Sequence, residues 1–315
     1  MMTSSRLSLL SPDFLPPLVC PGCRNGLDMT LNERAGSEKE RAGSEAEAHA
    51  KAEIADCVSL RCRGCGAEYP ISDGCPDFTL PGIDPIDDLL MEAFSSKSID
   101  EPTDTMTGSL QNPEKSGNMA DALQLGENEI ILDLCGGTGD LSMWLFRMGA
   151  RPWIVDFCLA RVAAARHRGL HAARASALSL PFPDKAFDRI ILSYTYHNWS
   201  DIRYRLRCLH EAARVLKVGG TMNILWIPNR FPKILSPGNY LSRNRIRTHV
   251  MARSPGWQPM FPMAVAEEVR SVIGDSFISS SLGSHDCGAG KFFLIRRVAP
   301  WLSWNLFDVK GIKIC

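Results

Sequence analysis

From residue 129 onward, short apolar runs alternate with longer stretches in which apolar residues recur every three or four positions. Short Ile-, Val- and Leu-rich runs are typical of buried strands, and the longer periodic stretches are typical of helices that cover a sheet. The predicted strands are residues 129–134, 152–157, 171–176, 186–194 and 221–227, and the predicted helices are 141–150, 159–169 and 204–220. A final helix at 263–274 and a closing hairpin at 277–298 follow. The order predicts an α/β fold with a doubly wound, Rossmann-like, seven-stranded sheet.

The chain before residue 119 follows a different pattern, and this divides the molecule into regions. We expect a small N-terminal module at 1–82, a linker at 83–118 with one short helix near 89–94, and the α/β domain at 119–300. A segment at 228–262 interrupts the periodicity, and residues 301–315 form an aromatic tail. Within the module, the charged insert 30–56 contains a direct duplication, ERAGSEK followed by ERAGSEA. Because it has almost no large apolar residues, we expect a solvated excursion, helical or disordered.

The composition narrows the classes of partner. The 315 residues include 35 Lys and Arg against 35 Asp and Glu, so the chain has no overall attraction to nucleic acid or to an anionic membrane. No apolar stretch approaches the ~20 residues that span a bilayer, and Asp13 and three prolines interrupt the early apolar segment. We therefore expect a cytoplasmic protein without a membrane span, for which nucleic acid is a less favoured partner than a small molecule.

Two cysteine pairs indicate a metal site in the N-terminal module. CPGC and CRGC have the two-residue gap that lets thiolates converge on one tetrahedral ion, with glycine allowing the tight turn. The predicted ligands of a structural Zn²⁺ ion are Cys20, Cys23, Cys62 and Cys65. Four protein ligands leave no open position, so the metal should stabilise the fold and not activate water. The alternative is four free or redox-active thiols, and Cys57 and Cys75 are the spare candidates.

After the second pair comes GAEYPISDGCPDFTLPG, at 66–82. The second cysteine loop is followed by Tyr-Pro-Ile, a turn and Pro-Asp-Phe. This order of motifs resembles that of the small zinc-ribbon family whose free-standing members partner and activate RNA and protein methyltransferases. In that family the turn usually runs Asp-Gly-Ile-Pro, whereas this chain has Cys75 at the apolar position. The resemblance implies a ribbon that docks on a methyltransferase and can serve as a platform for a protein partner.

The glycine-rich loop in ILDLCGGTGDLS follows the first strand of the α/β domain. A phosphate-binding P-loop would end in Gly-Lys-Ser/Thr, which is absent here. A dinucleotide fingerprint would need a third glycine near Leu141 or Ser142, and that is also absent. What remains is a carboxylate at the end of the first strand, Asp133, and another at the end of the second, Asp156.

This arrangement, with LPFPDKAFDRIILS at 180–193 and ARVLKVGG at 213–220, resembles the class I S-adenosylmethionine-dependent methyltransferases. Within that class the sequence looks most like those of the quinone-biosynthesis C-methyltransferases. The resemblance implies that the glycines admit the cofactor's methionine and adenosine parts and that Asp156 accepts the ribose hydroxyls. The implied residues binding S-adenosylmethionine are Asp133, Cys135, Gly136, Gly137, Gly139, Asp156, Phe157, Ser176, Ala177 and Ser193.

One position departs from the family pattern. Relatives usually carry an aspartate that receives the adenine amino group, and Ser176 stands there in this chain. A hydroxyl can still form a hydrogen bond to adenine but gives up a charge-assisted contact. We expect the chain to bind the cofactor with a lower affinity than relatives that carry the aspartate.

Three residues after the fourth strand are the candidates for chemistry on the acceptor. SYTYHNW places Tyr194, Tyr196 and His197 where they could orient or deprotonate an acceptor. The alternative is that the tyrosines pack in the core and His197 caps the next helix. Trp199 is expected to be a wall of the pocket.

The segment 228–262, which resembles the substrate cap of this fold, is basic. It could recognise an anionic acceptor, contact RNA, or be merely a solvated basic helix. Three functions remain open: methyl transfer to a small, cyclic or aromatic metabolite; methylation of an RNA base; and a non-catalytic S-adenosylmethionine-binding scaffold. Small-molecule methyl transfer is favoured because the motifs resemble those of the quinone-biosynthesis C-methyltransferases. The Asn-Pro-Pro-Tyr pattern that is typical of base flipping is also missing.

Overall fold

The computed structural model describes residues 16–31, 57–72, 74–79, 119–228, 230, 259–279 and 306–314. These residues form a seven-stranded sheet of order β10-β11-β9-β8-β5-β6-β7 and a four-stranded sheet of order β1-β2-β3-β4. Neighbouring strands from β9 to β7 in the large sheet are parallel, whereas β11 is antiparallel to both β9 and β10. The prediction of a doubly wound α/β fold is confirmed.

Five of the seven strands of the large sheet, β5 to β9, overlap the apolar runs that predicted strands. The seven strands are β5 (Ile130–Leu134), β6 (Arg151–Asp156), β7 (His171–Arg174), β8 (Phe187–Ser193), β9 (Leu216–Pro228), β10 (Gly274–Ser279) and β11 (Leu306–Lys313). Side chains alternate between two faces, so Ile190 and Leu192 of β8 enter one apolar cluster and Ile191 enters another. The sheet is therefore buried on both sides, as a mainly parallel sheet must be.

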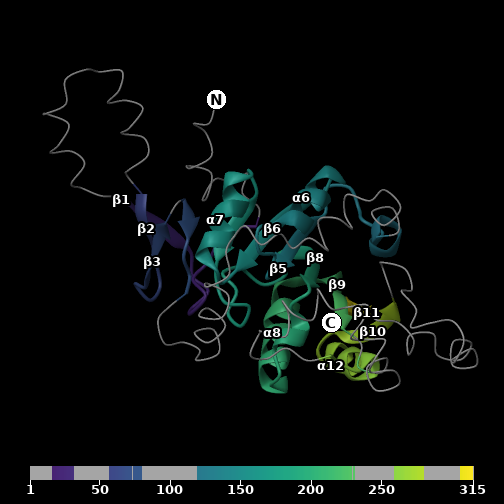
Figure 1. Ribbon diagram of the computed structural model, residues 1–315. Helices are drawn as coiled ribbons and strands as arrows, with labels where there is room; N and C mark the ends of the chain where they lie inside the picture. Colours follow the sequence, from purple (N-terminus) through teal and green to yellow (C-terminus); the bar gives the residue numbers. More distant parts are fainter. Residues whose placement is uncertain are drawn as a thin grey trace, which may run out of the picture.

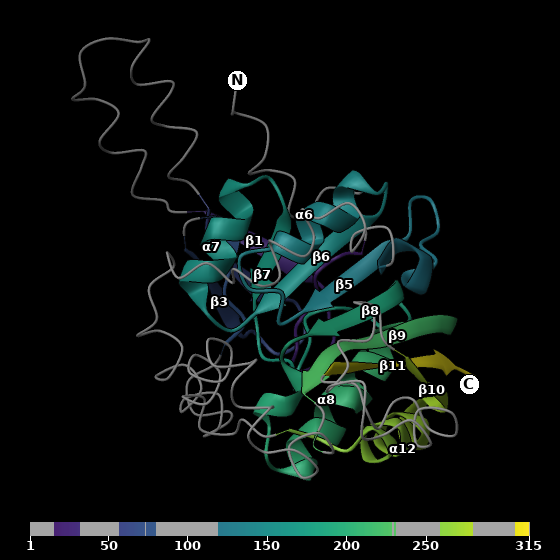
Figure 2. The ribbon, with the colours of Figure 1, turned by 45° about the vertical axis from the view of Figure 1, so that its right-hand side comes forward.

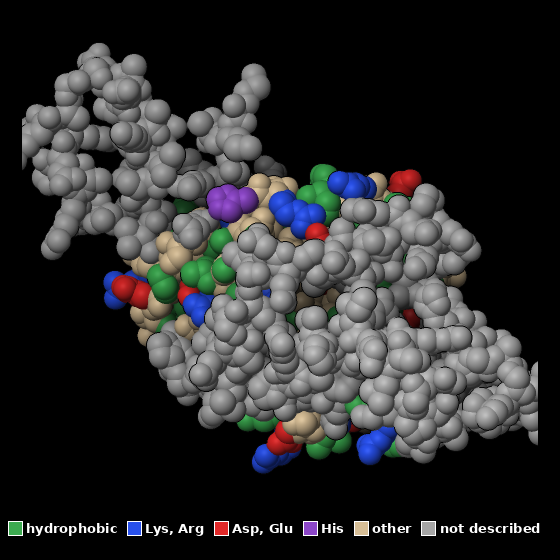
Figure 3. All heavy atoms as spheres, viewed as in Figure 1, with side chains coloured by type: hydrophobic (Ala, Val, Ile, Leu, Met, Phe, Trp, Pro, Cys, Tyr) green, Lys and Arg blue, Asp and Glu red, His purple; other side chains and the backbone are tan. Residues whose placement is uncertain are grey.

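Helices cover both faces of the large sheet. α6 (Asp140–Arg147) and α7 (Leu159–His167) lie on one face, and α8 (Ile202–Val215) and α12 (Pro262–Ile273) lie on the other (Figures 1 and 2). Residues 119–123 are also helical and pack with α6, because Met119 and Leu123 share a buried cluster with Leu141 and Leu145. On the side seen in Figure 3, acidic, basic and apolar side chains of the described residues are interspersed.

The last strand corrects the predicted end of the domain. We expected a hairpin at 277–298, most of which lies outside the described residues, and a tail at 301–315, in which residues 306–313 instead form β11, between β9 and β10. Val309 is fully buried in the main core. Gly311 permits close packing under α12, because a Cβ atom there would lie 2.7 Å from Cγ1 of Val269. The aromatic residues before this strand obscured its alternating pattern in the sequence.

The N-terminal ribbon, residues 16–31, 57–72 and 74–79, contains the smaller sheet. Its strands are β1 (Leu27–Leu31), β2 (Cys57–Cys62), β3 (Glu68–Ser72) and β4 (Cys75–Pro76), all antiparallel to their neighbours. The ribbon lies at the β7 edge of the large sheet (Figure 2). Leu60 and Tyr69 belong to the same apolar cluster as Trp153 and Phe182 of the larger domain. One continuous core therefore joins the two parts.

Several expected segments lie outside the described residues. They are the duplicated sequence at 33–46, the linker 83–118 with its short helix, and most of the cap 228–262. Within the described ranges, no helix combines the length and the apolar character that crossing a bilayer requires.

Candidate cofactor and metal sites

The loop that follows β5 is a tight turn that depends on glycine. Cys135, Gly137 and Gly139 have positive φ values of 61°, 57° and 81°. A Cβ atom on Gly136 would lie 2.7 Å from Cγ of Asp133. The backbone of this loop can therefore approach a ligand where no larger residue would fit.

Asp133 is fully buried beneath this loop. Its Oδ2 accepts a hydrogen bond of 2.7 Å from the Ser142 hydroxyl, whereas its Oδ1 has no hydrogen-bond partner within the described part of the chain. Burial raises the pKa of Asp133 from the ordinary 3.8 to about 7, with Asp156 adding to the effect and Ser142 opposing it. A buried carboxylate oxygen that lacks a donor suits a cationic group such as the ammonium of an amino acid.

Asp156, at the end of β6, anchors the loop from the neighbouring strand. Its Oδ2 accepts from the backbone N–H of Gly137 at 3.0 Å, and its Oδ1 accepts from that of Cys158 at 2.9 Å. Burial raises the pKa of this carboxyl, and Arg161 opposes the rise. A carboxylate has about four acceptor sites, so Asp156 can also accept a hydrogen bond from a ribose hydroxyl.

The other predicted cofactor residues follow the next strands. Phe157 comes directly after β6, Ser176 and Ala177 form the turn after β7, and Ser193 ends β8. The Ser176 hydroxyl accepts from the N–H of Leu178 at 3.1 Å, which leaves its own hydrogen to donate. All ten predicted residues therefore lie at or just beyond the carboxyl ends of β5, β6, β7 and β8, where doubly wound sheets bind ligands.

Tyr196 and His197 lie in the short helix η3 (Tyr196–Asn198) and are both fully buried. The Tyr196 hydroxyl donates to Oε2 of Glu268, 2.5 Å away, and Arg205 forms two hydrogen bonds to the same carboxylate. Burial raises the pKa of Tyr196 and lowers that of His197 to about 3. A general base works best when its pKa is near the working pH, so both environments favour a packing role over proton transfer.

Tyr194 has a different position. It follows β8 in the left-handed conformation, with φ at 56°, and its ring lies 5.1 Å from that of Trp226, centroid to centroid. It packs on the α6 face of the sheet, whereas Tyr196 packs on the α8 face. Of the three predicted catalytic residues, Tyr194 is therefore the one that this geometry favours. Sequence reasoning did not single out Trp226, because it stands in the apolar run ILWI at 224–227, where every residue looks like part of the core.

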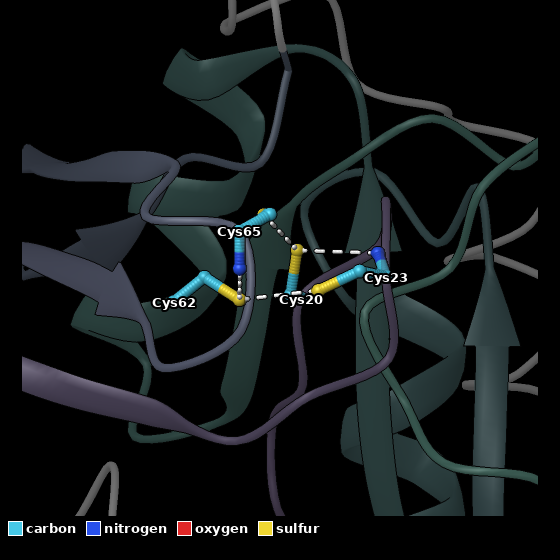
Figure 4. A group of neighbouring side chains, drawn as sticks. All are labelled: Cys20, Cys23, Cys62 and Cys65. Atoms are coloured by element: carbon cyan, nitrogen blue, oxygen red, sulfur yellow. Dashed lines mark hydrogen bonds between the residues drawn. The ribbon is translucent and has the colours of Figure 1, made fainter.

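The four predicted metal ligands converge from two loops of the N-terminal ribbon (Figure 4). Their sulfur atoms all lie within 4.8 Å of one another, with 3.7 Å between Cys20 and Cys65 and 3.3 Å between Cys23 and Cys62. The N–H groups of Gly64 and Cys65 point to Sγ of Cys62. A tetrahedral zinc with Zn–S bonds of ~2.3 Å needs sulfur atoms about 3.8 Å apart, so the donor set fits this ion.

The ribbon contacts the segment that carries the predicted adenine-binding residues. Asp77 accepts from Nη1 of Arg174 at 2.6 Å, and the two residues form a parallel β-bridge that extends the β7 edge. Arg174 also donates from Nε to the carbonyl of Phe157, 2.8 Å away. Farther along, Arg24 donates to the carbonyl of Leu180. The ribbon therefore packs against the turns that carry the predicted cofactor-binding residues, and no motif of the sequence pointed to these contacts.

The glycine loop between two strand-end carboxylates lies in a part of the chain that is similar to known methyltransferases. Residues 132–224 match the family described as a methyltransferase domain. The chain is 39% identical over 102 residues to a demethylmenaquinone methyltransferase of Corynebacterium urealyticum, a match that covers 32% of this chain and 43% of that protein. It is 33% identical over 157 residues to the ubiquinone/menaquinone biosynthesis C-methyltransferase UbiE of Neisseria gonorrhoeae, covering 46% of this chain and 61% of that protein.

A solved structure of geranyl diphosphate C-methyltransferase from Streptomyces coelicolor A3(2) is also similar. The two sequences are 15% identical and the TM-score is 0.49. The match covers 75% of this chain and 100% of the chain in the solved structure. The two curated relatives named above are matched over about half of their length, 43% and 61%.

Proposed function

We propose that the protein transfers a methyl group from S-adenosylmethionine to a small cyclic or aromatic acceptor. The observation that carries the proposal is the glycine loop held between the buried carboxylates Asp133 and Asp156, inside the segment that matches the methyltransferase family. The aromatic acceptor is supported by the two relatives, a demethylmenaquinone methyltransferase and a ubiquinone/menaquinone biosynthesis C-methyltransferase.

The residues divide the work of binding. Asp133 receives the cofactor's ammonium through Oδ1, Asp156 accepts the ribose hydroxyls, and Ser176 donates to adenine. When bound, the cofactor supplies a methyl group already activated by its sulfonium. The chain then needs only to hold the acceptor in line with that methyl and to exclude water. Tyr194, at the end of β8, orients the acceptor.

We also propose that Cys20, Cys23, Cys62 and Cys65 hold a structural Zn²⁺ ion. The sulfur spacing carries this proposal, because the thiol pKa values diverge: hydrogen bonds from Asn25 lower the pKa of Cys23 to about 6, whereas the pKa of Cys65 is raised to about 12. Thiolates are the form that binds zinc. The ion has no open coordination position and takes no part in the reaction.

The test combines cofactor binding with methyl transfer. Titration calorimetry with S-adenosylmethionine should show binding that Asp156→Asn weakens roughly 10- to 100-fold, because the hydrogen bonds from the ribose and the loop lose their charged acceptor. Asp28→Asn, an exposed position in β1, is the matched control and should bind normally. Absence of binding by the unaltered protein would refute the cofactor assignment.

Incubation with methyl-labelled cofactor, cell extract and reduced 1,4-naphthohydroquinone as a model acceptor then separates the candidate functions. Label in the small-molecule fraction or the naphthohydroquinone supports the proposal. Label confined to RNA would establish the RNA base methyltransferase instead, and cofactor binding without any labelled product would favour the scaffold. Docking of a further protein on the ribbon and a cytoplasmic location stay predictions of the sequence.

A further inference from the structure

Trp226 breaks the side-chain alternation of β9. Met222 and Ile224 pack in the core beneath α8 and α12, and the regular pattern would send Trp226 to that same face. Instead, Leu225 and Trp226 both pack in the cluster on the α6 face. Two consecutive residues on one face are the mark of a β-bulge, and bulges re-aim side chains next to active sites.

The strand pairing and the backbone confirm the bulge. Ile224 of β9 pairs with Val309 of β11, and Ile227 pairs with Phe307, so three steps along β9 face two along β11. Trp226 has φ at 59°, a conformation that is strained for a bulky residue. The residue opposite the bulge is Asp308.

Asp308 holds the bulge in place. Its Oδ1 accepts the backbone N–H of Trp226 at 2.7 Å, which replaces the ladder hydrogen bond that the bulge removes. This carboxylate is 3% exposed, so the fold buries a charged side chain to support one strained residue. Strain that is maintained in this way is characteristic of functional sites.

The bulge brings Trp226 to a second strained aromatic residue. Tyr194, at the end of the adjacent strand β8, is also left-handed, and its N–H donates to the carbonyl of Leu225 at 3.2 Å. The two rings lie 5.1 Å apart with an interplanar angle of 43°. An aromatic pair thus stands at the carboxyl ends of β8 and β9, on the ligand-binding edge of the sheet.

The indole nitrogen of Trp226 is a buried donor with no hydrogen-bond partner within the described residues. Buried polar groups are nearly always paired, so an unpaired donor on the ligand edge indicates that a ligand completes it. The proposed cofactor-binding residues lie at the ends of β5, β6, β7 and β8, and none lies on β9, so we assign the indole to the acceptor and not to the cofactor. β9 lies two strands from β5, or about 10 Å at the usual strand spacing.

We propose that Trp226 binds the methyl acceptor, donating a hydrogen bond from Nε1 to a hydroxyl or carbonyl oxygen of a planar aromatic ring that packs beside Tyr194. This inference rests on the proposed function and deepens it. It makes Trp226 a determinant of acceptor specificity, because an acceptor without that oxygen leaves the indole unpaired. A ring that carries oxygen directly, such as a hydroquinone or naphthol, fits both the donor and the aromatic surface.

The test is nuclear magnetic resonance of the full chain labelled with ¹⁵N at the indole nitrogens, with 1,4-naphthohydroquinone kept reduced as the probe. Trp226→Phe identifies the resonance by its disappearance. With S-adenosylhomocysteine already bound, the probe should move the Trp226 N–H resonance downfield as the hydrogen bond forms. S-adenosylhomocysteine alone should leave the indole N–H unpaired and its resonance unshifted. A resonance that shifts with S-adenosylhomocysteine alone, or that does not shift at the highest soluble probe concentration, overturns the proposal.

Binding and kinetics of the variant give the second readout. Trp226→Phe keeps an aromatic ring and should raise the Kd or KM for the probe roughly 5- to 100-fold, the range for one lost hydrogen bond with its partner left unpaired, at unchanged cofactor affinity. Trp153→Phe, at a buried tryptophan of β6 in the opposite core cluster, is the control and should leave the probe's KM unchanged. Weakened cofactor binding in Trp226→Phe contradicts the assignment. A probe that shifts the indole supports the subsite, whereas methyl label that is absent from both the probe and the small-molecule fraction refutes the proposed reaction.

Discussion

The two proposed ligand sites of this protein are built in opposite ways. The cysteine site draws four like side chains from two short loops of the N-terminal ribbon, each loop supplying a pair only three positions apart. The cofactor site draws unlike residues from the ends of four strands, spread from Asp133 to Ser193. The first site is local and is determined by spacing, and the second is determined by topology. The contacts of the ribbon with the turn after β7 couple the two.

The largest expected effect comes from breaking the cysteine site. Cys62→Ser should lower the bound zinc from about one ion per chain to a small fraction, and the ribbon should lose its cooperative folding, because structural zinc contributes about 10–16 kcal/mol in isolated small domains. Metal analysis and thermal unfolding measure the two effects. Cys158→Ser is the matched control, since this cysteine lies at the N-cap of α7, where serine is well tolerated. Zinc retained by Cys62→Ser would refute the four-cysteine site.

The next change tests the coupling of the two sites. Asp77→Asn removes the carboxylate from a mostly buried ion pair with Arg174, whose side chains are 11% and 19% exposed. Stability should fall by about 2–4 kcal/mol, slightly less than for a completely buried pair. Because Arg174 also holds the carbonyl of Phe157, cofactor affinity should fall several-fold.

Asp28→Asn is the control for this coupling, because Asp28 and Arg63 also form a pair at 2.6 Å but are 58% and 64% exposed. Its stability and its cofactor affinity should stay near those of the unaltered protein. Equal cofactor affinity in the two variants, measured by calorimetry, would show that the ribbon does not support the cofactor site.

The sequence predicted the local features and missed those that depend on strand order. Apolar periodicity located the strands from β5 to β9, and the two Cys-x-x-Cys pairs were brought together as expected. β11 was missed because its pairing with β9 joins residues about 85 positions apart in sequence, a register that no local pattern contains. The bulge at Trp226 depends on that same pairing.

The cofactor site was predicted by position but not by environment. Motif spacing placed Asp133 and Asp156 at neighbouring strand ends, and the structure agrees. It could not show that Tyr196 is committed to Glu268 of α12, or that His197 is completely enclosed, since both facts arise from the packing of η3 against distant helices. Burial of a titratable group follows from the tertiary fold, and sequence patterns carry little information about it.

A smaller effect concerns pH and the carboxyl of Asp133. Because burial raises its pKa to about 7 in the folded protein, this group is protonated below that value and cannot attract the cofactor's ammonium. Affinity for S-adenosylmethionine should therefore rise as pH increases from about 6 to 8, by up to about tenfold per pH unit below the pKa. Asp133→Asn should abolish this dependence in calorimetry, and an unchanged pH profile in that variant would exclude Asp133 as its source.

The same shift has a defined sign for stability without ligand. The folded protein holds a proton on Asp133 more tightly than the unfolded chain, whose pKa is near the ordinary 3.8. Between pH ~4 and ~7 the folded state therefore binds the extra proton, and the contribution of this group to the free energy of unfolding decreases as pH rises through that window. Denaturant unfolding at pH 5 and pH 7 measures this contribution. The decrease in the free energy of unfolding between the two pH values should be larger for the unaltered protein than for Asp133→Asn.

The smallest expected effect tests the one departure from the family pattern in the cofactor site. Ser176→Asp restores a carboxylate that can accept from the adenine amino group, and charge-assisted hydrogen bonds are about twice as strong as neutral ones. Because Ser176 is only 9% exposed, the cost of burying the charge offsets part of this gain, so we expect the Kd for S-adenosylmethionine to fall only about two- to fivefold. Ser176→Asn has nearly the same size without the charge and should gain less. If both variants bind equally well, shape and not charge decides recognition here, and the serine does not account for weaker binding.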